Sequence, residues 1–430
     1  CGLSIQTGGD CGGNGSDGGT GYGKMVGEQI MSDVYEKSVE LHAKHAGKIR
    51  LESKIEVENS EDLSLVYTPG VAQVSREIAS DKNKSFELTW RGETVAVISD
   101  GSAVLGLGNI GPEAALPVME GKAMLMMRFG GVSAVPIVVD LHTEDELVEF
   151  VSKIAPSFGA INLEDIASPV CIGVEDRLQN LGIPVFHDDQ HGTAIVVSAA
   201  IQNGAKVVGK KYEDLVVVVS GAGAAGLAIT QMLLGVERKD GGLVKVEGAR
   251  RVGEVRLVDS RGVISAKRDD LNKWKSEFLK ITNPDGVEGG MKEVMRGSDV
   301  FIGVSAPGIV SKEMVEGMNE KTIVLAMANP EPEIMPELAH EAGAMIVGTG
   351  RSDYPNQVNN SLAFPGIFKG LLESRATKIT IGVKQRVSEV LAGLVEPTIE
   401  KILPSMFDEG VAEKIAEAVV EQVEREGLAR

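Results

Sequence analysis

The sequence predicts an α/β protein with two parallel-sheet domains and C-terminal helices. From residue 94 onward, short apolar runs alternate with stretches of helical periodicity. Alternation of this kind is typical of parallel sheets that carry helices on both faces. The apolar runs are 94–100, 134–140, 160–166 and 183–189 in the first half, and 215–221, 254–260, 299–305, 322–330 and 344–350 in the second. A glycine-rich turn after the first run of the second half indicates that a new domain starts there.

The length of 430 residues predicts two to three domains. We expect a disordered Gly-rich tail over 1–24, a first α/β domain over 25–200, a nucleotide-binding domain over 201–370 and packed C-terminal helices over 371–430. A helical pattern also covers 32–45. Because the chain opens at Cys1 and Met25 would make a natural start, the tail is interpreted as an upstream extension or a fragment edge. A lipidated N-terminal cysteine left by signal cleavage is the alternative.

Composition excludes several classes of partner. The formal net charge of −19 argues against nucleic acid and against an anionic membrane surface. The three cysteines, Cys1, Cys11 and Cys171, are too scattered for a disulfide framework or a zinc site, which fits a reducing cytoplasm. The apolar stretch 215–234 is long enough to cross a bilayer, but the glycines in its middle favour a strand, a loop and a helix. No membrane segment is therefore expected.

A glycine triplet predicts a Rossmann-like dinucleotide site. Gly221, Gly223 and Gly226 follow an apolar strand directly and precede a helix. The first glycine makes the turn, the second lets the backbone approach the pyrophosphate, and the third lets the helix pack on the strand. Ala224 and Ala225 open that helix, whose N-terminus faces the phosphates of the expected cofactor, NAD or NADP. A tight structural turn is the alternative.

The next strand of this domain ends at Asp259, which we expect to bind the adenosine ribose hydroxyls. The glycines lie further from Asp259 than the usual ~20 residues, and a polar insertion over 237–253 explains the longer spacing. The alternative for Asp259 is that it only caps the end of the strand. Asp259 repels the 2′-phosphate of NADP, whereas Arg261 attracts it, with Lys267 or Arg268 in support. The repulsion between the Asp259 carboxylate and the 2′-phosphate is about 1–3 kcal/mol, and an exposed arginine offsets only part of it. We therefore expect kcat/KM to be roughly tenfold or more higher with NAD than with NADP.

Two acidic pairs follow successive strands of the first domain. Glu164 and Asp165 end one strand, and Asp188 and Asp189 end the next, about one β–α unit later. Neighbouring parallel strands bring these carboxylates together, and like charges at that range either destabilise the fold or force protonation. A hard divalent cation with oxygen ligands removes the problem, which predicts Mg²⁺ or Mn²⁺. Solvated or helix-capping acids are the alternative.

The candidate catalytic, metal-binding and cofactor-binding residues lie at the carboxyl ends of predicted strands, where open parallel sheets bind ligands. These residues are Asp100, Glu164, Asp165, Asp188, Asp189, Gly221, Asp259, Ser305 and Asn329. Because both domains contribute, we expect the site in the cleft between them. His187 and His191 flank the second acidic pair, but neither is counted as a metal ligand, and His191 is expected to be structural.

Several motifs together resemble the malic enzymes, in the small form found in bacteria and archaea. They span roughly residues 60–370. The matching stretches are 66–72, 99–123, 161–169, 184–194, 220–226, 327–334 and 348–368. The resemblance implies NAD(P)-dependent, metal-dependent oxidative decarboxylation of (S)-malate to pyruvate and carbon dioxide, with decarboxylation of oxaloacetate as a side activity. It also implies a homodimer whose ligands are small molecules.

The resemblance assigns the catalytic groups residue by residue. Tyr67 corresponds to the general acid and Lys122 to the general base or its close partner, with Asp188 paired to Lys122. On the residues alone, Tyr67 precedes a Pro-Gly turn and fits a packing role equally well. Lys122 likewise fits a surface lysine whose stem lies along apolar side chains.

The metal and substrate ligands are assigned in the same way. Glu164, Asp165 and Asp189 correspond to the metal ligands. Asn329 and Asn360 correspond to the asparagines that hold malate and the nicotinamide end, with Asn359 beside them and Ser305 at the cofactor. The larger members of the family carry an arginine where this chain has Ala103. The substrate carboxylate must therefore find another partner, such as the asparagines or backbone N–H groups.

General chemistry fits these roles. Oxidation of malate needs a base for the C2 hydroxyl proton while a hydride leaves for the nicotinamide. A lysine near a dication has a lowered pKa, which makes it a usable base. The metal then acts as a Lewis acid as carbon dioxide departs, and a phenol can donate a proton to C3.

Two other functions compete with this interpretation. A malolactic enzyme shares the fold, converts malate to lactate and retains the nucleotide. A non-catalytic NAD-sensing regulator needs no acidic cluster and usually carries a basic DNA-binding module. The chain has the acidic cluster and lacks a basic module, which disfavours the regulator.

Overall fold

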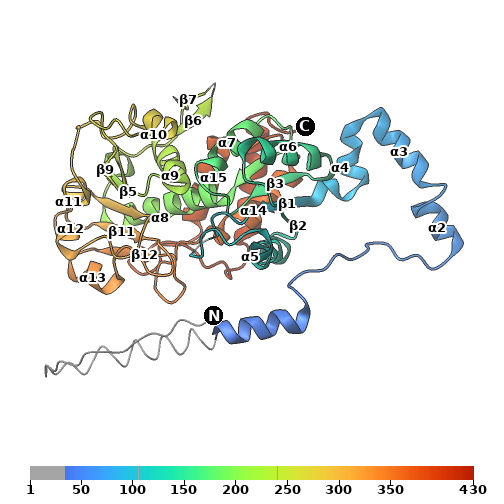
Figure 1. Ribbon diagram of the computed structural model, residues 1–430, viewed down its shortest axis with the longest axis horizontal. Coiled ribbons are helices and arrows are strands. Elements are labelled where there is room, and N and C mark those ends of the chain that lie inside the picture. Colours follow the sequence, from blue (N-terminus) through green and yellow to red (C-terminus); the bar gives the residue numbers. More distant parts are fainter. Residues whose placement is uncertain (1–33, 105, 240) are drawn as a thin grey trace, which may run out of the picture. The chain divides into compact units, whose positions relative to one another are not determined.

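The computed structural model describes residues 34–104, 106–239 and 241–430 (Figure 1). The tail expected to be disordered, residues 1–24, lies outside the described residues. Two compact units make up the chain, one ending at Arg50 and one running from Leu51 to Arg430. In the first unit, residues 34–45 are helical, as the pattern over 32–45 predicts.

A four-stranded parallel sheet forms the first half of the second unit. Its strands are β1 (Thr94–Ser99), β2 (Ser133–Val138), β3 (Ala160–Leu163) and β4 (Val185–His187), in the order β2-β1-β3-β4. The helices between them are α5 (Pro112–Leu125), α6 (Glu144–Ile154) and α7 (Val170–Leu178). Every residue of β1 and β3 is buried, as expected for central strands that helices cover on both faces.

The helix α8 (Thr193–Val208) leads from this sheet to the second one, and thirteen of its residues are buried. The second sheet has the order β12-β11-β10-β5-β8-β9. Its strands are β5 (Val216–Ser220), β8 (Glu254–Asp259), β9 (Gly262–Val263), β10 (Val300–Gly303), β11 (Ile323–Ala326) and β12 (Ile346–Thr349). All of its pairings are parallel except β8 with the short edge strand β9. The expected α/β fold with a Rossmann-like second half is confirmed.

Short helices connect the strands of the second sheet. They are α9 (Ala224–Leu234), α10 (Lys273–Phe278), α11 (Met291–Met295), α12 (Lys312–Glu316) and α13 (Pro336–Glu341). The expected insertion over 237–253 contains a hairpin made of β6 (Val236–Lys239) and β7 (Gly242–Lys245). The apolar stretch 215–234 forms β5 and α9, separated by the glycine turn. Among the described residues, no helix has both the length and the apolar character needed to cross a membrane.

Three C-terminal helices return to the body: α14 (Phe364–Glu373), α15 (Ile381–Gly393) and α16 (Val411–Arg425). The helix α14 lies beside β3 of the first sheet. Figure 1 shows both elements near the centre of the view. It packs closely on α16, because a Cβ at Gly366 or Gly370 would lie 2.6 Å from a backbone oxygen of α16. Phe368 of α14 meets Phe186 of β4 edge-on, with ring centroids 5.8 Å apart.

Within the second unit, three α-helices precede β1: α2 (Ser60–Val66), α3 (Val71–Ser80) and α4 (Ser85–Leu88). Neither α2 nor α3 has a buried residue. Their side chains therefore contribute no core to the unit to which they belong.

One buried amide joins α8 to the C-terminal helices and makes their packing testable. Asn203 is fully buried and donates to the carbonyls of Ala392 at 2.8 Å and Ile402 at 2.9 Å. We expect Asn203→Ala to destabilise the protein by about 2 kcal/mol or more, because two buried carbonyls lose their donor. Thermal unfolding monitored by calorimetry measures the effect. The exposed Asn83 provides the control Asn83→Ala, and equal melting temperatures for the two variants would contradict the prediction.

Candidate active site

Three carboxylates meet at the carboxyl ends of β3 and β4. Oxygen atoms of Glu164, Asp165 and Asp189 all lie within 4.8 Å of one another. The backbone N–H of Asp165 donates to Asp189 Oδ2 at 2.9 Å, so the two strand ends are tied together. Asp165 adopts a left-handed φ of 54°, a conformation that aspartate tolerates better than most residues. The structure thus brings together the three residues expected to bind metal.

Lys122 of α5 lies buried against the same carboxylates. Its Nζ is 2.7 Å from Glu164 Oε1 and 2.5 Å from Asp188 Oδ2. The ring of Phe364, from α14, is centred 4.3 Å from that nitrogen. Lys122 is therefore not the surface lysine that its sequence also allowed, and the pairing with Asp188 is as the resemblance implies.

The electrostatics of this cluster are unusual. Burial, followed by the charge of Asp189, raises the pKa of Glu164 well above its ordinary value. Burial also raises the pKa of Asp188 to about 6, although Lys122 opposes the shift. Burial alone would lower the pKa of Lys122, but the carboxylates of Asp188 and Glu164 outweigh it and raise that pKa. One lysine does not balance four carboxyl groups, so the donor set fits a hard divalent cation.

A cavity of about 600 Å³ is lined by Asp165 and Asp189 and reaches the second domain, whereas Lys122, Glu164 and Asp188 are not among its lining residues. Ten of the residues expected at the site line it. They are Asp165, Asp189, Gly223, Ala224, Ala225, Gly226, Ser305, Asn329, Asn359 and Asn360. The expectation of a shared cleft is met, because strand ends of both sheets open onto one volume. Ala103 lines the same cavity.

Close packing explains the glycines of the nucleotide loop. Gly221 has a left-handed φ of 112°, and a Cβ there would lie 2.6 Å from the carbonyl oxygen of Val304. A Cβ on Gly226 would lie 1.7 Å from the carbonyl oxygen of Gly221, so only glycine lets α9 begin against the turn. Gly223, Ala224 and Ala225 at the start of α9 line the cavity, and the N-terminus of this helix is where a pyrophosphate binds in this fold.

Sequence reasoning missed several side chains that hold the site together. Glu333 is fully buried and accepts from the backbone N–H groups of Ser305 at 2.9 Å and Ala328 at 3.0 Å. Asn162 donates to Glu164 Oε2 at 2.9 Å. Both residues lie within the stretches that resemble the malic enzymes. Each is a polar residue in a segment that is otherwise apolar, and this feature of the sequence could have identified them.

Glu175 of α7 supports the turn that carries the second acidic pair. Its carboxylate lies 2.9 Å from His191 Nε2 and accepts from the backbone N–H of His187 at 3.3 Å. The π-helical turn Asp188–Gly192 between β4 and α8 is held from behind by this contact. His191 thus has the structural role that the sequence predicts.

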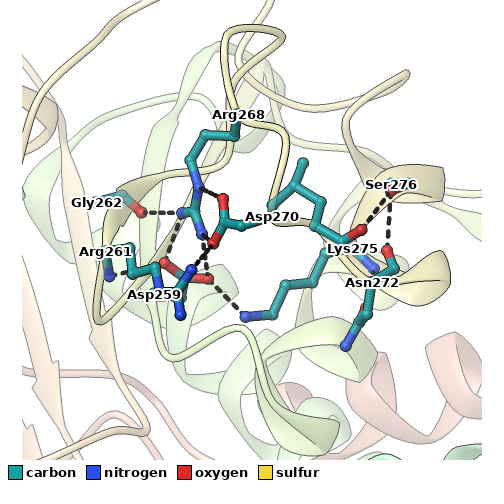
Figure 2. A network of polar contacts seen from close by, with 9 residues as sticks. Asp259, Arg261, Gly262, Arg268, Asp270, Asn272, Lys275 and Ser276 are labelled. Carbon is teal, nitrogen blue, oxygen red and sulfur yellow. Dashed lines mark hydrogen bonds and ion pairs between the residues drawn. The ribbon is translucent and has the colours of Figure 1, made fainter.

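Asp259 lies at the end of β8 and does not line the cavity. Figure 2 shows its carboxylate enclosed by Arg268 and Lys275, while Arg261 turns toward Asp270. The side chain of Arg261 is 70% exposed. The sequence anticipated Arg268 only as a supporting residue and did not anticipate Lys275.

Tyr67 stands apart from the other expected catalytic residues. It follows α2 directly, its side chain is 66% exposed, and it is not among the described residues that line the cavity. The structure of one chain therefore does not bring Tyr67 to the acidic cluster. The exposure also rules out the alternative that Tyr67 packs in the core of its own chain.

Comparison with known proteins agrees with this geometry. The family model for the malic enzyme N-terminal domain matches residues 46–179, and that for the malic enzyme NAD-binding domain matches residues 190–424. A bifunctional malic/malolactic enzyme of Bacillus subtilis (strain 168) is 49% identical over 92% of this chain and 94% of its own length. An NADP-dependent malic enzyme of Halomonas elongata is 39% identical over 93% of this chain and 96% of its own length. The crystal structure of an NAD-dependent malic enzyme from Thermotoga maritima matches with a TM-score of 0.84 at 47% identity, covering 89% of this chain and 98% of that one. The chain belongs to the malic enzyme family.

Proposed function

We propose that this protein catalyses the oxidative decarboxylation of (S)-malate to pyruvate and carbon dioxide, with reduction of a nicotinamide nucleotide and a requirement for Mg²⁺ or Mn²⁺. The observation that carries the proposal is the cavity in which Asp165 and Asp189 face the glycine loop of the nucleotide domain. Formation of reduced nucleotide from malate and Mn²⁺, with pyruvate measured at the end, tests it. If no pyruvate forms with NAD and none forms with NADP, the proposal is contradicted.

The residues divide the chemistry between them. Glu164, Asp165 and Asp189 would hold the dication, which when bound supplies a Lewis acid that stabilises negative charge on the C2 oxygen. Lys122, in its neutral form, takes the proton of the C2 hydroxyl as the hydride leaves C2 for the nicotinamide. Asp188 accepts from Lys122 and keeps the nitrogen aimed at that proton. A cation held by Glu164 would compete with Lys122 for that carboxylate, which would weaken one cause of the raised pKa of this lysine.

Binding of malate and the nicotinamide end is assigned to the amide side chains of the cavity. Asn329, Asn359 and Asn360 line it together with Ser305. The segment that carries Ser305 is fixed because Glu333 accepts its backbone N–H. Because residue 103 is alanine and not arginine, these amides supply the donors for the substrate carboxylate. In this proposal, the domain boundary at about residue 200 separates a domain that binds substrate and metal from a domain that binds the nucleotide.

Removal of one carboxylate tests the metal site directly. We expect Asp189→Asn to weaken Mn²⁺ binding by about tenfold or more and to reduce turnover, because one anionic ligand is lost. Paramagnetic resonance of free Mn²⁺ measures the binding without any turnover. The matched control is Asp140→Asn, since Asp140 lies just beyond β2 of the same sheet and its side chain is 82% exposed. Equal Mn²⁺ affinity in the two variants would count against the metal site.

We further propose that the protein is a homodimer in which a second copy supplies Tyr67. The helices α2 and α3 have no buried residue, and Leu63, Leu65 and Tyr67 are all at least half exposed. An apolar face of this kind is typical of a surface that another chain covers. The cavity of the same chain lacks Tyr67 among its described lining residues, so a phenol for protonation of C3 must come from elsewhere.

Mixing two inactive variants tests both the dimer and the shared site. We expect Tyr67→Phe and Lys122→Ala each to lose malate oxidation to pyruvate. After the two are unfolded and refolded together, about a quarter of the wild-type activity should return, because about half of the dimers are mixed and each mixed dimer has one intact site. The control is each variant refolded alone. If the mixture stays inactive although mixed dimers form, Tyr67 does not act across the interface.

A malolactic activity is a second candidate, because the Bacillus subtilis relative carries that function in its name. In that reaction the reduced nucleotide returns its hydride to pyruvate before it is released. Malate that carries deuterium at C2 distinguishes the two outcomes in the presence of excess unlabelled NADH, since lactate then contains the deuterium only if the nucleotide is retained. The cytoplasmic location expected from the cysteine content stays a prediction.

A further inference from the structure

The imidazole of His187 is buried beside the acidic cluster without a hydrogen bond of its own. His187 is the last residue of β4, and its side chain is 1% exposed. Within the part of the chain that the structure describes, neither Nδ1 nor Nε2 has a hydrogen-bond partner. His191, four residues later, differs, because its Nε2 lies 2.9 Å from Glu175 Oε2. Buried polar side chains normally have a partner, so the fold alone does not account for a histidine at position 187.

The ring of His187 lies next to one of the proposed metal ligands. His187 and Asp189 both line the cavity of about 600 Å³. The distance from His187 Nδ1 to Asp189 Oδ2 is 3.7 Å, which is too long for a hydrogen bond. The backbone of His187 is fixed, since it pairs with Leu163 of β3 and its N–H donates to Glu175 Oε1 at 3.3 Å. A rotation of the Asp189 side chain is therefore the simplest movement that closes the gap.

Asp189 is the least restrained of the three carboxylates that face one another. Its side chain is 37% exposed, whereas Glu164 and Asp165 are buried. Its Oδ2 accepts from the backbone N–H of Asp165 at 2.9 Å, and the described residues provide no second hydrogen bond to this carboxylate. Carboxylates that bind a metal are normally oriented by hydrogen bonds from neighbouring groups. Asp189 thus lacks a donor at the position where His187 Nδ1 lies.

An imidazole can supply the missing donor. It carries one N–H group when neutral and two when charged, so at least one is present in either state. A donor on Nδ1 would bind one oxygen of Asp189 and leave the other oxygen to the cation. The ring itself is not a metal ligand, because the group of ligand atoms within 4.8 Å of one another contains Glu164, Asp165 and Asp189 but not His187.

We propose that His187 is a positioning residue that orients the Asp189 carboxylate toward the divalent cation through a hydrogen bond from Nδ1. The juxtaposition that carries the proposal is a buried imidazole without a hydrogen bond, placed 3.7 Å from the most exposed of the three acids. The proposal rests on the metal site of the proposed function. It does not depend on which nucleotide is used or on the fate of pyruvate.

Two substitutions of the same shape test the proposal. Asparagine carries an N–H donor on the atom that corresponds to Nδ1, and leucine carries a methyl group there. We expect His187→Leu to weaken Mn²⁺ binding by about tenfold or more, and His187→Asn to retain most of the affinity. Paramagnetic resonance of free Mn²⁺ measures the affinity without malate or nucleotide. His142→Leu is the control, because His142 is exposed and lies 3.1 Å from Asp140, and it should leave the affinity unchanged.

The melting temperature of the metal-free protein separates positioning from a structural role. The side chain of His187 makes no hydrogen bond in this structure, and an apolar group of similar shape removes two unsatisfied polar atoms from a buried site. EDTA-treated His187→Leu should therefore melt at the wild-type temperature or above it. A lower melting temperature combined with unchanged Mn²⁺ affinity would show a structural role and overturn the proposal.

A double-mutant cycle shows whether His187 acts through Asp189. In an Asp189→Ala background, His187→Leu should change Mn²⁺ affinity by less than about twofold, because the carboxylate that the ring positions is gone. The proposal is overturned if the full loss persists in that background, if the leucine and asparagine variants lose affinity equally, or if neither loses any. Wild-type protein that binds no Mn²⁺ would instead refute the metal site of the proposed function, and the role of His187 with it.

Discussion

The crowding of carboxylates at the end of the first sheet, most of them buried, is the constraint on which the site depends. Glu164, Asp165 and Asp189 place oxygens within 4.8 Å of one another, and Asp188 lies beside them on Lys122. Such an arrangement costs free energy in an apolar interior unless positive charge balances it. Lys122 supplies part of that charge, and its own burial is tolerated because two of these carboxylates pair with it. The cluster is therefore both electrostatically incomplete and well ordered, which is what a site prepared for a divalent cation requires.

The surrounding fold keeps this cluster in place through contacts from distant parts of the chain. The ring of Phe364 from α14 covers the nitrogen of Lys122, and Glu175 of α7 holds the turn that carries Asp188 and Asp189. Glycine at position 192 is needed as well, since a Cβ there would lie 1.9 Å from Asp188 Oδ1. A single cavity then joins the acidic edge of one sheet to the glycine loop of the other. Hydride transfer from a substrate held at the carboxylates to a nicotinamide would need this proximity.

A protein with a net charge of −19 must create positive potential locally if it is to bind anions. Two devices are visible in the nucleotide domain. The N-terminus of α9 offers backbone N–H groups to the cavity without any charged side chain. The cluster around Asp259 offers three cations against two carboxylates, so the acid that ordinarily excludes a 2′-phosphate is already paired. Relatives named for NAD and for NADP both match this chain, at 47% and 39% identity respectively.

The sequence by itself determined the alternation of strands and helices, the glycine turn before α9 and the meeting of the two acidic pairs. These features depend on local periodicity and on the rule that parallel strands end at the same edge of a sheet, so they can be read from neighbouring residues. Tertiary structure decided the rest. The partners of Lys122 come from the residue after β3, the turn after β4 and α14. The donors to Asp259 include Lys275, sixteen residues away on another element. The exposure of Tyr67 likewise follows from where α2 and α3 lie, not from the residues around it. Side-chain partners that are far apart in the chain carry no local periodicity, and the charge state and hydrogen-bond capacity of a site depend on those partners.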